Sequence, residues 1–415
     1  MRYRMITLLF FVIAFFLIDI YVFQAVLNVS KSWPSPWKAM MRYGFWIPTL
    51  LCIGALAWWF FADPYKINSG ARNWIMTGLF ATYFSKLFAV LFLFVDDGQR
   101  LVKWIARYFS KKPAESMTGE VISRSQFLTH AALAATVIPF GAMAYGIISG
   151  AHDYRVKRIA IKLPNLPKSF DGIRIAQLSD IHSGSFFNKT AVKGGVEMVL
   201  KEKPDMIFFT GDLVNNESSE VKGYMDVFNK LRAPLGVFSV TGNHDYGDYK
   251  NWASKEDKQQ NFKDLIEAHR LLGFDLLMNQ HRTIEQSGDR IAIIGIENWG
   301  GRFVKYGKLD QAYAGTDEVS TKILLSHDPS HWDAQVRPGY QDIDLMLSGH
   351  THGFQFGVEI GGFKWSPSQY AYKQWAGLYK EDDQYLYVNR GFGYLGYPGR
   401  VGMPPEITIL ELKRA

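Results

Sequence analysis

The sequence predicts a membrane region of four apolar helices followed by an α/β domain built from layered sheets. Four mostly apolar stretches lie within the first 150 residues, and at about 20 residues each they are long enough to cross a bilayer. After residue 151, short runs of β-branched and aromatic residues alternate with helix-like segments. Five of these runs end in aspartate, histidine or asparagine, and this pattern predicts where ligands bind.

The composition agrees with a membrane region. Of the 415 residues, 48% are hydrophobic and 15% are aromatic, which is high for a wholly soluble protein. The excess is local, and the predicted transmembrane helices span residues 5–27, 44–62, 74–95 and 128–148. The sequence therefore predicts a transmembrane region over residues 1–150 and an integral, multi-pass membrane protein.

Two ionisable residues, Asp19 and Lys86, fall inside the predicted helices. A charge at membrane depth is costly unless it is paired or faces a polar interior, so a functional role is the usual hypothesis. No further charges accompany these two to form a relay. We therefore favour a structural ion pair or a snorkelling lysine over a functional relay.

The charges of the loops bear on orientation and on partners. The loops on one side of the predicted helices carry nine lysines and arginines, against seven on the other, which places the C-terminal domain outside the cytoplasm. The net charge of +7 lies partly beside the membrane and favours anionic lipid as a partner. We expect no nucleic acid partner, because no basic helix or aromatic-basic recognition motif is present. The single cysteine, Cys52, cannot form an internal disulfide.

Residues 151–415 have the pattern of a soluble α/β domain. Val221, Tyr224, Phe228 and Leu231 share one face of a predicted amphipathic helix between strands. Strands that alternate with helices imply sheets covered by helices. The predicted strands span residues 173–179, 206–210, 237–241, 290–296, 322–326, 345–348, 386–389 and 407–412.

The stretch Thr241-Gly242-Asn243-His244-Asp245 follows the apolar strand at residues 237–241. Glycine allows a sharp turn there, and the turn presents a carboxamide, an imidazole and a carboxylate together. Strand ends are where open α/β sheets bind ligands. Taken alone, the stretch fits an Asn/Asp turn with an incidental histidine equally well.

Four other predicted strands end in similar side chains. A lone histidine at a strand end is usually a structural residue, but five such ends in chain order favour one shared site. The candidates are Asp180, His182, Asp212, Asn243, His244, Asp245, His327, His350 and His352.

The types of these side chains predict a metal centre. A set of carboxylates, imidazoles and a carboxamide without thiolate suits Mn²⁺, Fe²⁺ or Zn²⁺. The candidates outnumber the ligands that one ion needs. We therefore expect two divalent ions about 3.5–4 Å apart that share one carboxylate and hold the attacking and leaving oxygens of a phosphoryl displacement.

The motif order D-x-H, G-D, G-N-H-D, a lone H and G-H-x-H resembles that of the calcineurin-like metallophosphoesterase superfamily, from residue 173 to the C-terminus. The phrases S-D-I-H at Ser179–His182 and P-P-E-I at Pro404–Ile407 are similar to those of its exported bacterial members. The helices that precede them resemble the transmembrane proteins with a metallophosphoesterase domain. The resemblance implies an α-β-β-α sandwich with two mixed sheets over residues 151–415.

The resemblance also implies roles for the residues. The implied ligands of one metal are Asp180, His182 and His352, those of the other are Asn243, His327 and His350, and the implied bridge is Asp212. His244 matches the histidine that protonates the leaving group or stabilises transition-state charge, and Asp245 would orient its imidazole. A metal-bridging hydroxide would be the nucleophile.

Several positions leave alternatives open. Phe354 stands where the related proteins have a second glycine, and it either narrows or stacks in the substrate pocket or is an ordinary strand residue. Residues 246–262 form a polar insertion that could be a lid over the site. Aromatic residues between 363 and 379 are either core or a rim that suits a domain pressed against the bilayer.

Three polar residues also allow two interpretations each. Arg390 and Arg400 resemble positions of the related proteins and would either bind phosphate in a bidentate manner or form surface salt bridges. Asn215, three residues after Asp212, would either orient a ligand or cap the following turn.

The resemblance implies a membrane-anchored, dinuclear metal-dependent phosphoesterase. Its substrate would be a phosphomonoester, phosphodiester or pyrophosphate, with a lipid-linked or amphipathic phosphoester as the leading class by analogy of fold. One alternative is a nucleotide or cyclic-nucleotide phosphodiesterase. Another is a membrane sensor or scaffold whose metal domain binds without turnover, and the pairing of His244 with Asn243 argues against it.

Overall fold

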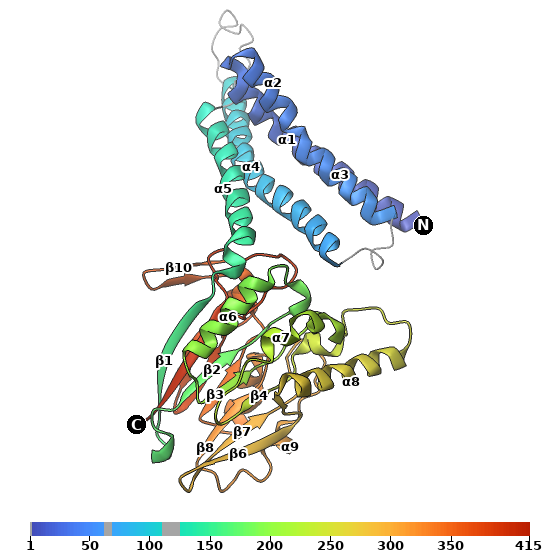
Figure 1. Ribbon diagram of the computed structural model, residues 1–415. Coiled ribbons are helices and arrows are strands. Elements are labelled where there is room, and N and C mark those ends of the chain that lie inside the picture. The colour runs from blue at the N-terminus through green and yellow to red at the C-terminus, as the bar shows by residue number, and fades with distance from the viewer. Residues whose placement is uncertain (1, 62–68, 110–124) are drawn as a thin grey trace, which may run out of the picture. The chain divides into compact units, whose positions relative to one another are not determined.

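The computed structural model describes residues 2–61, 69–109 and 125–415 (Figure 1). Contacts between residues divide the chain into two units, Met1–Ala144 and Tyr145–Ala415. Residues 110–124, which contribute to the predicted loop charges, lie outside the described residues, as does Lys66.

Apolar helices form the first unit and confirm the membrane region. They are α1 (Arg2–Val29), α2 (Ser35–Gly44), α3 (Trp46–Phe61), α4 (Ser69–Phe109) and α5 (Gln126–Ile148). Four candidate membrane spans are present, and α2 and α3 together make one of them. Helix α4 is longer than the predicted span of residues 74–95, because it continues into a charged segment in which Arg100 donates to Asp97 at 2.9 Å.

Asp19 and Lys86 form an ion pair that is buried inside the first unit. The Asp19 carboxylate also accepts hydrogen bonds from Thr49 at 2.9 Å and from the Tyr83 hydroxyl at 3.0 Å. A buried charge with a full set of partners is stable at this depth. The structural ion pair is therefore confirmed, and the snorkelling lysine is wrong because the Lys86 side chain is buried.

The second unit contains two six-stranded sheets. The first sheet has the order β1 (Arg155–Leu163), β14 (Glu406–Arg414), β2 (Arg174–Leu178), β3 (Met206–Phe209), β4 (Val237–Ser239) and β5 (Asp275–Leu276). The second sheet has the order β12 (Gly377–Glu381), β13 (Gln384–Val388), β9 (Leu345–Ser348), β8 (Thr321–Leu325), β7 (Asp289–Gly295) and β6 (Gln280–Gln286). Both sheets mix parallel and antiparallel pairs, as expected.

Helices cover the outer faces of the two sheets. Buried side chains such as Phe208, Phe238 and Leu325 fill the space between the sheets. The first sheet is covered by α6 (Lys189–Lys201), α7 (Met225–Phe228) and α8 (Lys255–Leu272), and the second by α9 (Leu309–Tyr313) and the helical segment from Trp332 to Gly339 (Figure 1). The α-β-β-α sandwich is therefore confirmed.

All eight predicted strands are present, whereas four strands of the two six-stranded sheets, β1, β5, β6 and β12, were not predicted. Edge strands β1 and β6 are partly exposed and rich in charged and polar residues, and β6 has Ile284 as its one aliphatic residue, so they lack the apolar run of a buried strand. The predicted amphipathic helix is mostly a 3₁₀ segment, Ser218–Tyr224, followed by the single turn of α7. Its apolar face is correct, but Gly223 lies within it and lowers its α-helical propensity.

The parallel strands set the position of the site. Strands β2, β3 and β4 run parallel in the first sheet, and β7, β8 and β9 run parallel in the second. Their carboxyl ends therefore lie along one edge of each sheet. The carbonyl of Thr210 after β3 accepts a hydrogen bond from Nδ1 of His327 after β8 at 2.7 Å, so the two edges meet.

Candidate metal centre

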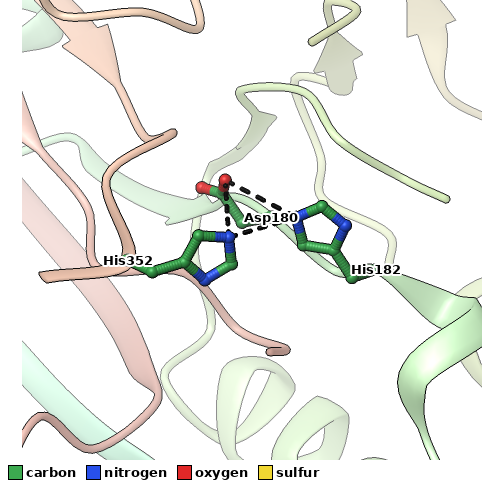
Figure 2. A group of neighbouring side chains, drawn as sticks. All are labelled: Asp180, His182 and His352. Carbon is green, nitrogen blue, oxygen red and sulfur yellow. Dashed lines mark hydrogen bonds and ion pairs between the residues drawn. The ribbon is translucent and has the colours of Figure 1, made fainter. Parts of the chain in front are cut away.

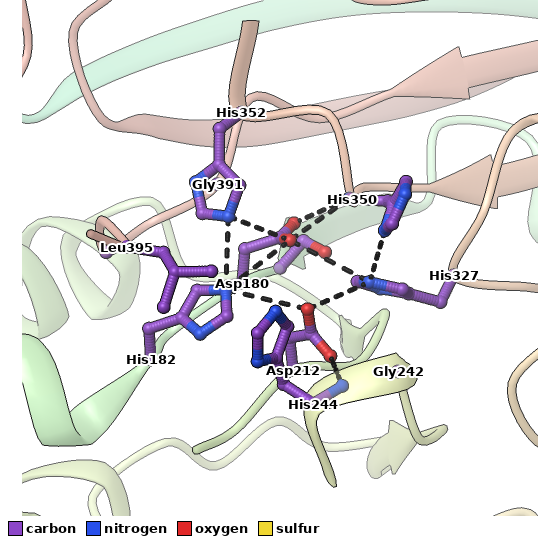
Figure 3. A network of polar contacts seen from close by, with 12 residues as sticks. Asp180, His182, Asp212, Gly242, His244, His327, His350, His352, Gly391 and Leu395 are labelled. Atoms are coloured by element: carbon purple, nitrogen blue, oxygen red, sulfur yellow. Dashed lines mark hydrogen bonds and ion pairs between the residues drawn. The ribbon is translucent and has the colours of Figure 1, made fainter. Parts of the chain in front are cut away.

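The loops after five parallel strands bring the predicted residues together. They follow β2, β3 and β4 in the first sheet and β8 and β9 in the second. The converging side chains are Asp180, His182, Asp212, His244, His327, His350 and His352, and most of them are buried (Figure 3).

Asp180, His182 and His352 form the first triad (Figure 2). Nε2 of His352 lies 3.3 Å from Oδ1 of Asp180 and 3.1 Å from Nε2 of His182. All three potential ligand atoms lie within 4.8 Å of one another. Two imidazole nitrogens and a carboxylate oxygen aimed at one point are a typical ligand set for a divalent transition metal.

Asp212, His327 and His350 form the second triad. Nε2 of His327 lies 3.1 Å from Oδ2 of Asp212 and 3.3 Å from Nδ1 of His350. The same Oδ2 atom lies 3.5 Å from Nε2 of His182, so the Asp212 carboxylate stands between the two triads (Figure 3). One carboxylate is thus within reach of two ion positions.

Asn243 lies beside His244 in the loop after β4 and is buried. Its amide nitrogen donates to the Tyr249 hydroxyl at 2.8 Å. Its buried Oδ1 has no hydrogen-bond partner among the described residues. A buried carbonyl oxygen without a partner is costly, so this atom fits a metal ligand. The residues therefore fit two divalent ions.

Hydrogen bonds behind the triads hold three of the imidazoles. Nδ1 of His327 donates to the Thr210 carbonyl at 2.7 Å, and Nε2 of His350 lies 2.7 Å from the Tyr372 hydroxyl. Arg400 donates to Nδ1 of His352 at 3.2 Å. In each ring the remaining nitrogen faces the triad, as is usual for histidines that bind metals.

Burial keeps most of these imidazoles neutral. It lowers the pKa of His182 to about 3 and that of His350 to about 4. Neutral imidazole is the form that binds metals. Burial also lowers the pKa of His327, but the carboxylates of Asp212 and Asp180 outweigh it and raise this pKa to about 10. A cation beside these carboxylates would compete with that proton.

Five of the candidate ligands have left-handed backbone conformations. Their φ angles are 51° at Asp180, 48° at His182, 61° at Asp212, 72° at His350 and 53° at His352. Such a conformation costs a non-glycine residue about 1–2 kcal/mol. Strain of this kind persists where the surrounding fold imposes it and collects at functional sites.

Gly242 is required by close packing and not by an unusual turn. Its φ of −106° and ψ of −176° are extended and open to any residue. A Cβ atom at this position would lie 2.2 Å from Oδ1 of Asp212. The turn expected from the sequence is therefore corrected to a close approach between the loops after β3 and β4.

His244 is half-buried at the rim of the centre. Its Nδ1 donates to the Asn215 carbonyl at 2.7 Å, and its backbone N–H donates to Oδ1 of Asp212 at 2.8 Å. Its ring lies edge to face with that of His182 at a centroid distance of 5.0 Å. Asn215 thus orients an imidazole through its backbone carbonyl.

The role expected of Asp245 needs correction. Its buried carboxylate accepts backbone N–H groups of the loops after β3 and β4. The donors are Asp212 at 3.0 Å, Leu213 at 2.8 Å, Val214 at 3.3 Å and Gly242 at 2.9 Å. Asp245 therefore fixes the backbone that carries Asp212, and Asn215 orients His244.

Arg390 and Arg400 are both fully buried, so the expectation of surface salt bridges is wrong. Arg390 donates to Glu359 at 2.6 Å. Arg400 donates to backbone carbonyls, among them those of Gly393 at 2.5 Å and Met403 at 3.2 Å. The Arg400 guanidinium is thus occupied by the protein, whereas the buried Nε of Arg390 has no hydrogen-bond partner among the described residues and lies 3.6 Å from the Glu406 carboxylate.

The polar insertion at residues 246–262 is largely ordinary structure. Helix α8 begins at Lys255 and packs Leu265 and Leu272 into the core. Tyr249, in the connection before α8, contacts Asn243 and places its ring 4.5 Å from that of His244. The sequence placed Tyr249 in a polar insertion and Tyr372 among the aromatic residues between 363 and 379, but it did not connect either with the centre, because a tyrosine in a loop has no distinctive spacing.

Glu220 was also missed, although its spacing from Glu217 matches a capping box. Its carboxylate accepts the backbone N–H of Asn215 at 2.6 Å and that of Glu217 at 3.3 Å. It therefore holds the loop whose carbonyl orients His244. Burial raises the pKa of Glu220 to about 7, since desolvation outweighs these backbone hydrogen bonds.

This raised pKa predicts a pH-dependent effect of Glu220→Gln. With a folded-state pKa of about 7 against an ordinary value of 4.5, Glu220 stabilises the fold below pH 4.5, and this contribution is lost as the pH rises to 7. Glutamine does not titrate, so the variant does not lose this stability. Relative to the wild type, its free energy of unfolding should therefore rise by on the order of 3 kcal/mol between pH 4.5 and pH 7. Thermal unfolding of the full chain in detergent at several pH values measures this, with Glu197→Gln on the exposed side of α6 as control. An equal pH dependence in both variants would contradict the assignment.

Two family models match the chain. "Probable Calcineurin-like phosphoesterase, transmembrane domain" matches residues 2–151, and "Calcineurin-like phosphoesterase" matches residues 173–354. A transmembrane protein with metallophosphoesterase domain from Danio rerio is 30% identical over 316 residues, which cover 72% of this chain and 68% of that protein. An uncharacterized metallophosphoesterase from Bacillus subtilis (strain 168) is 32% identical over 292 residues, 66% of this chain and 94% of that protein. Among solved structures, the chain is similar to the NAD nucleotidase of Haemophilus influenzae, with a TM-score of 0.36 and 15% identity, over 53% of this chain and 51% of that one.

Proposed function

Because this chain belongs to the calcineurin-like metallophosphoesterases that carry an N-terminal transmembrane domain, we propose that its centre holds two divalent ions and hydrolyses a phosphoester with the help of His244. The observation that carries the proposal is the position of Asp212, whose carboxylate lies between two triads of potential ligands. A shared carboxylate is the arrangement that two-ion hydrolysis requires. The catalytic domain in this proposal is residues 151–415.

The proposed ligands fall into two sets. Asp180, His182 and His352 would hold one ion, Asn243, His327 and His350 would hold the other, and Asp212 would contact both. Oxygen and imidazole donors without thiolate suit Mn²⁺, Fe²⁺ or Zn²⁺. When bound, such ions supply positive charge to the phosphoryl oxygens and lower the pKa of a coordinated water.

His244 is proposed to serve the leaving group. Its Nδ1 is occupied by the Asn215 carbonyl, which leaves Nε2 to hold a proton for the departing oxygen. Its ring is only half-buried, so a substrate can reach it. Asp245 is a positioning residue in this proposal, because it acts through the backbone of the loop that carries Asp212.

His244→Ala tests the proposed function. Hydrolysis of a chromogenic phosphodiester by the full chain in detergent with Mn²⁺ should fall by on the order of 10²-fold, because general acid catalysis is lost. The metal content should stay at the wild-type level, since no proposed ligand is removed. A variant that keeps most of its activity would overturn the role of His244. Metal binding without turnover of any phosphoester by the wild type would favour a sensor or scaffold.

A lipid-linked or amphipathic phosphoester is the proposed substrate class. The domain follows directly on α5, which is long and apolar enough to span a membrane. A substrate held in the bilayer would therefore be concentrated near the metal centre. The loop charges place this domain outside the cytoplasm in our proposal.

A further inference from the structure

A two-stranded hairpin interrupts the second unit between β9 and β12. Its strands β10 (Val358–Ile360) and β11 (Phe363–Trp365) pair only with each other. The turn between them is Gly361-Gly362, with φ angles of 56° and 89°, as tight hairpin turns prefer. A lone two-stranded hairpin is marginally stable in water, so its surroundings must support it.

The hairpin exposes its apolar face and turns its charged face inward. Ile360 and Phe363 stand opposite each other and are 72% and 64% exposed. Of the other two cross-strand pairs, Val358 stands opposite Trp365, and Glu359 stands opposite Lys364. The Glu359 side chain is 40% exposed but pairs with the domain, as does Lys364. Glu359 accepts from Arg390 at 2.6 Å, while Lys364 donates to the Ala376 carbonyl and lies over the Trp375 ring. A hairpin that faces water would have the reverse arrangement.

Further exposed aromatic side chains flank the hairpin in the sequence. Phe354 precedes the hairpin and is 61% exposed, and Tyr370 follows it and is also largely exposed. Exposed apolar side chains that gather in one segment mark an interaction site. We call this set the hairpin surface, and it consists of Phe354, Val358, Ile360, Phe363 and Tyr370.

The hairpin surface is continuous in sequence with the loop that carries two proposed metal ligands. Phe354 is the second residue after His352. Ser366, after the hairpin, donates to the Gly353 carbonyl at 2.8 Å, and Ser368 donates to the Thr351 carbonyl at 3.3 Å. The hairpin and the loop that carries these two ligands, which we call the metal loop, are therefore held together by hydrogen bonds.

The base of the hairpin is also tied to the end of the last membrane helix. Gly357 donates to the Val401 carbonyl at 2.9 Å, and the backbone N–H of Arg400 donates to the Gly146 carbonyl near the end of α5 at 3.1 Å. Gly146 belongs to the same unit as the hairpin. The segment at Arg400 and Val401 thus holds the hairpin on one side and the end of a membrane-spanning helix on the other.

From these contacts, we propose that the hairpin surface lies in the lipid–water interface beside the end of α5. Its aliphatic and aromatic side chains suit the boundary of headgroups and acyl chains. The metal loop would then face the bilayer surface. On the proposed function, this places the phosphoester of a membrane-embedded substrate within reach of the centre, with Phe354 against its apolar part.

Lipid contact can be measured without any enzymatic activity. The full chain, with Cys52 replaced by alanine, receives one cysteine at Phe363 that is labelled with an environment-sensitive fluorophore. A matched label replaces Leu271, which is 55% exposed on α8. In vesicles of phosphatidylcholine and phosphatidylglycerol, brominated lipid should quench the label at position 363 several-fold more than that at position 271. Equal quenching, or shielding of position 363 that depends on a second copy of the chain, would overturn the proposal.

A second measurement tests the consequence for the substrate. In the double variant Ile360→Asp/Phe363→Asp, the ratio of the hydrolysis rate on a vesicle-borne phosphoester to that on a soluble one should fall several-fold. The ratio should stay at the wild-type value in Leu271→Asp. An unchanged ratio in the double variant would contradict the consequence. If the wild type cleaves neither substrate while position 363 is quenched by lipid, the proposed function fails and the lipid contact stands.

Discussion

Asp212→Asn should abolish phosphoester hydrolysis and strip the protein of metal. One carboxylate oxygen of Asp212 lies 3.1 Å from Nε2 of His327 and 3.5 Å from Nε2 of His182. Asparagine has nearly the same shape but carries no charge and offers one oxygen in place of two. Losing several kcal/mol of charge stabilisation at the reacting phosphoryl group should lower the turnover rate by about 10³-fold or more.

Turnover and metal content of the full chain in detergent measure this effect together. Asp226→Asn is the matched control, because Asp226 is exposed and only pairs with Lys189. The control should keep its metal and its rate. Full metal content with normal turnover in Asp212→Asn would rule out a shared carboxylate.

Arg400→Ala should unfold the catalytic domain at a markedly lower temperature. Burial lowers the pKa of Arg400 to about 10, so the guanidinium is still charged at neutral pH. It donates to His352 and to several buried carbonyls, including those of Gly393 and Arg390. Each buried carbonyl without a donor costs about 1–3 kcal/mol, so the total loss should be at least about 3 kcal/mol.

Thermal unfolding in detergent should show a decrease in midpoint of about 6–12 °C for a domain of this size. The unfolding midpoint of Arg400→Lys should lie between those of the wild type and Arg400→Ala, because an ammonium cannot reach all of these acceptors. Arg155→Ala, at an exposed arginine that pairs with Asp153, should change the midpoint little. A midpoint for Arg400→Ala equal to that of Arg155→Ala would mean that the carbonyls find other donors.

The strands that carry the centre could be predicted because each is an apolar run with polar side chains at its end. The runs that became β2, β3, β4, β8 and β9 are buried on both faces, so their sequences are distinctive. Edge strands such as β6 lack this signature, because they are partly exposed and consist mostly of polar residues. These buried strands predicted an α/β domain, whereas the α-β-β-α sandwich was implied by the resemblance of the motifs to the metallophosphoesterases.

Contacts between distant loops could not be predicted. Asp245 stands next to His244, yet its carboxylate binds amides more than thirty residues earlier in the chain. Arg400 follows a glycine-rich stretch typical of a surface loop, yet it is buried against His352. Such partners depend on how loops cross in three dimensions, and spacing along the chain carries no record of it.

The left-handed backbone at five candidate ligands has a consequence for protein engineering. A procedure that ranks substitutions by backbone preference alone would replace Asp180, His182, Asp212, His350 or His352 with glycine, because glycine adopts these φ angles without strain. Each change would relieve backbone strain, but it would also remove a candidate metal ligand. Consensus or stability design on this scaffold should therefore hold these positions fixed and seek its gains elsewhere. The residues with the strained backbone conformations are the ones that a designer should leave unchanged.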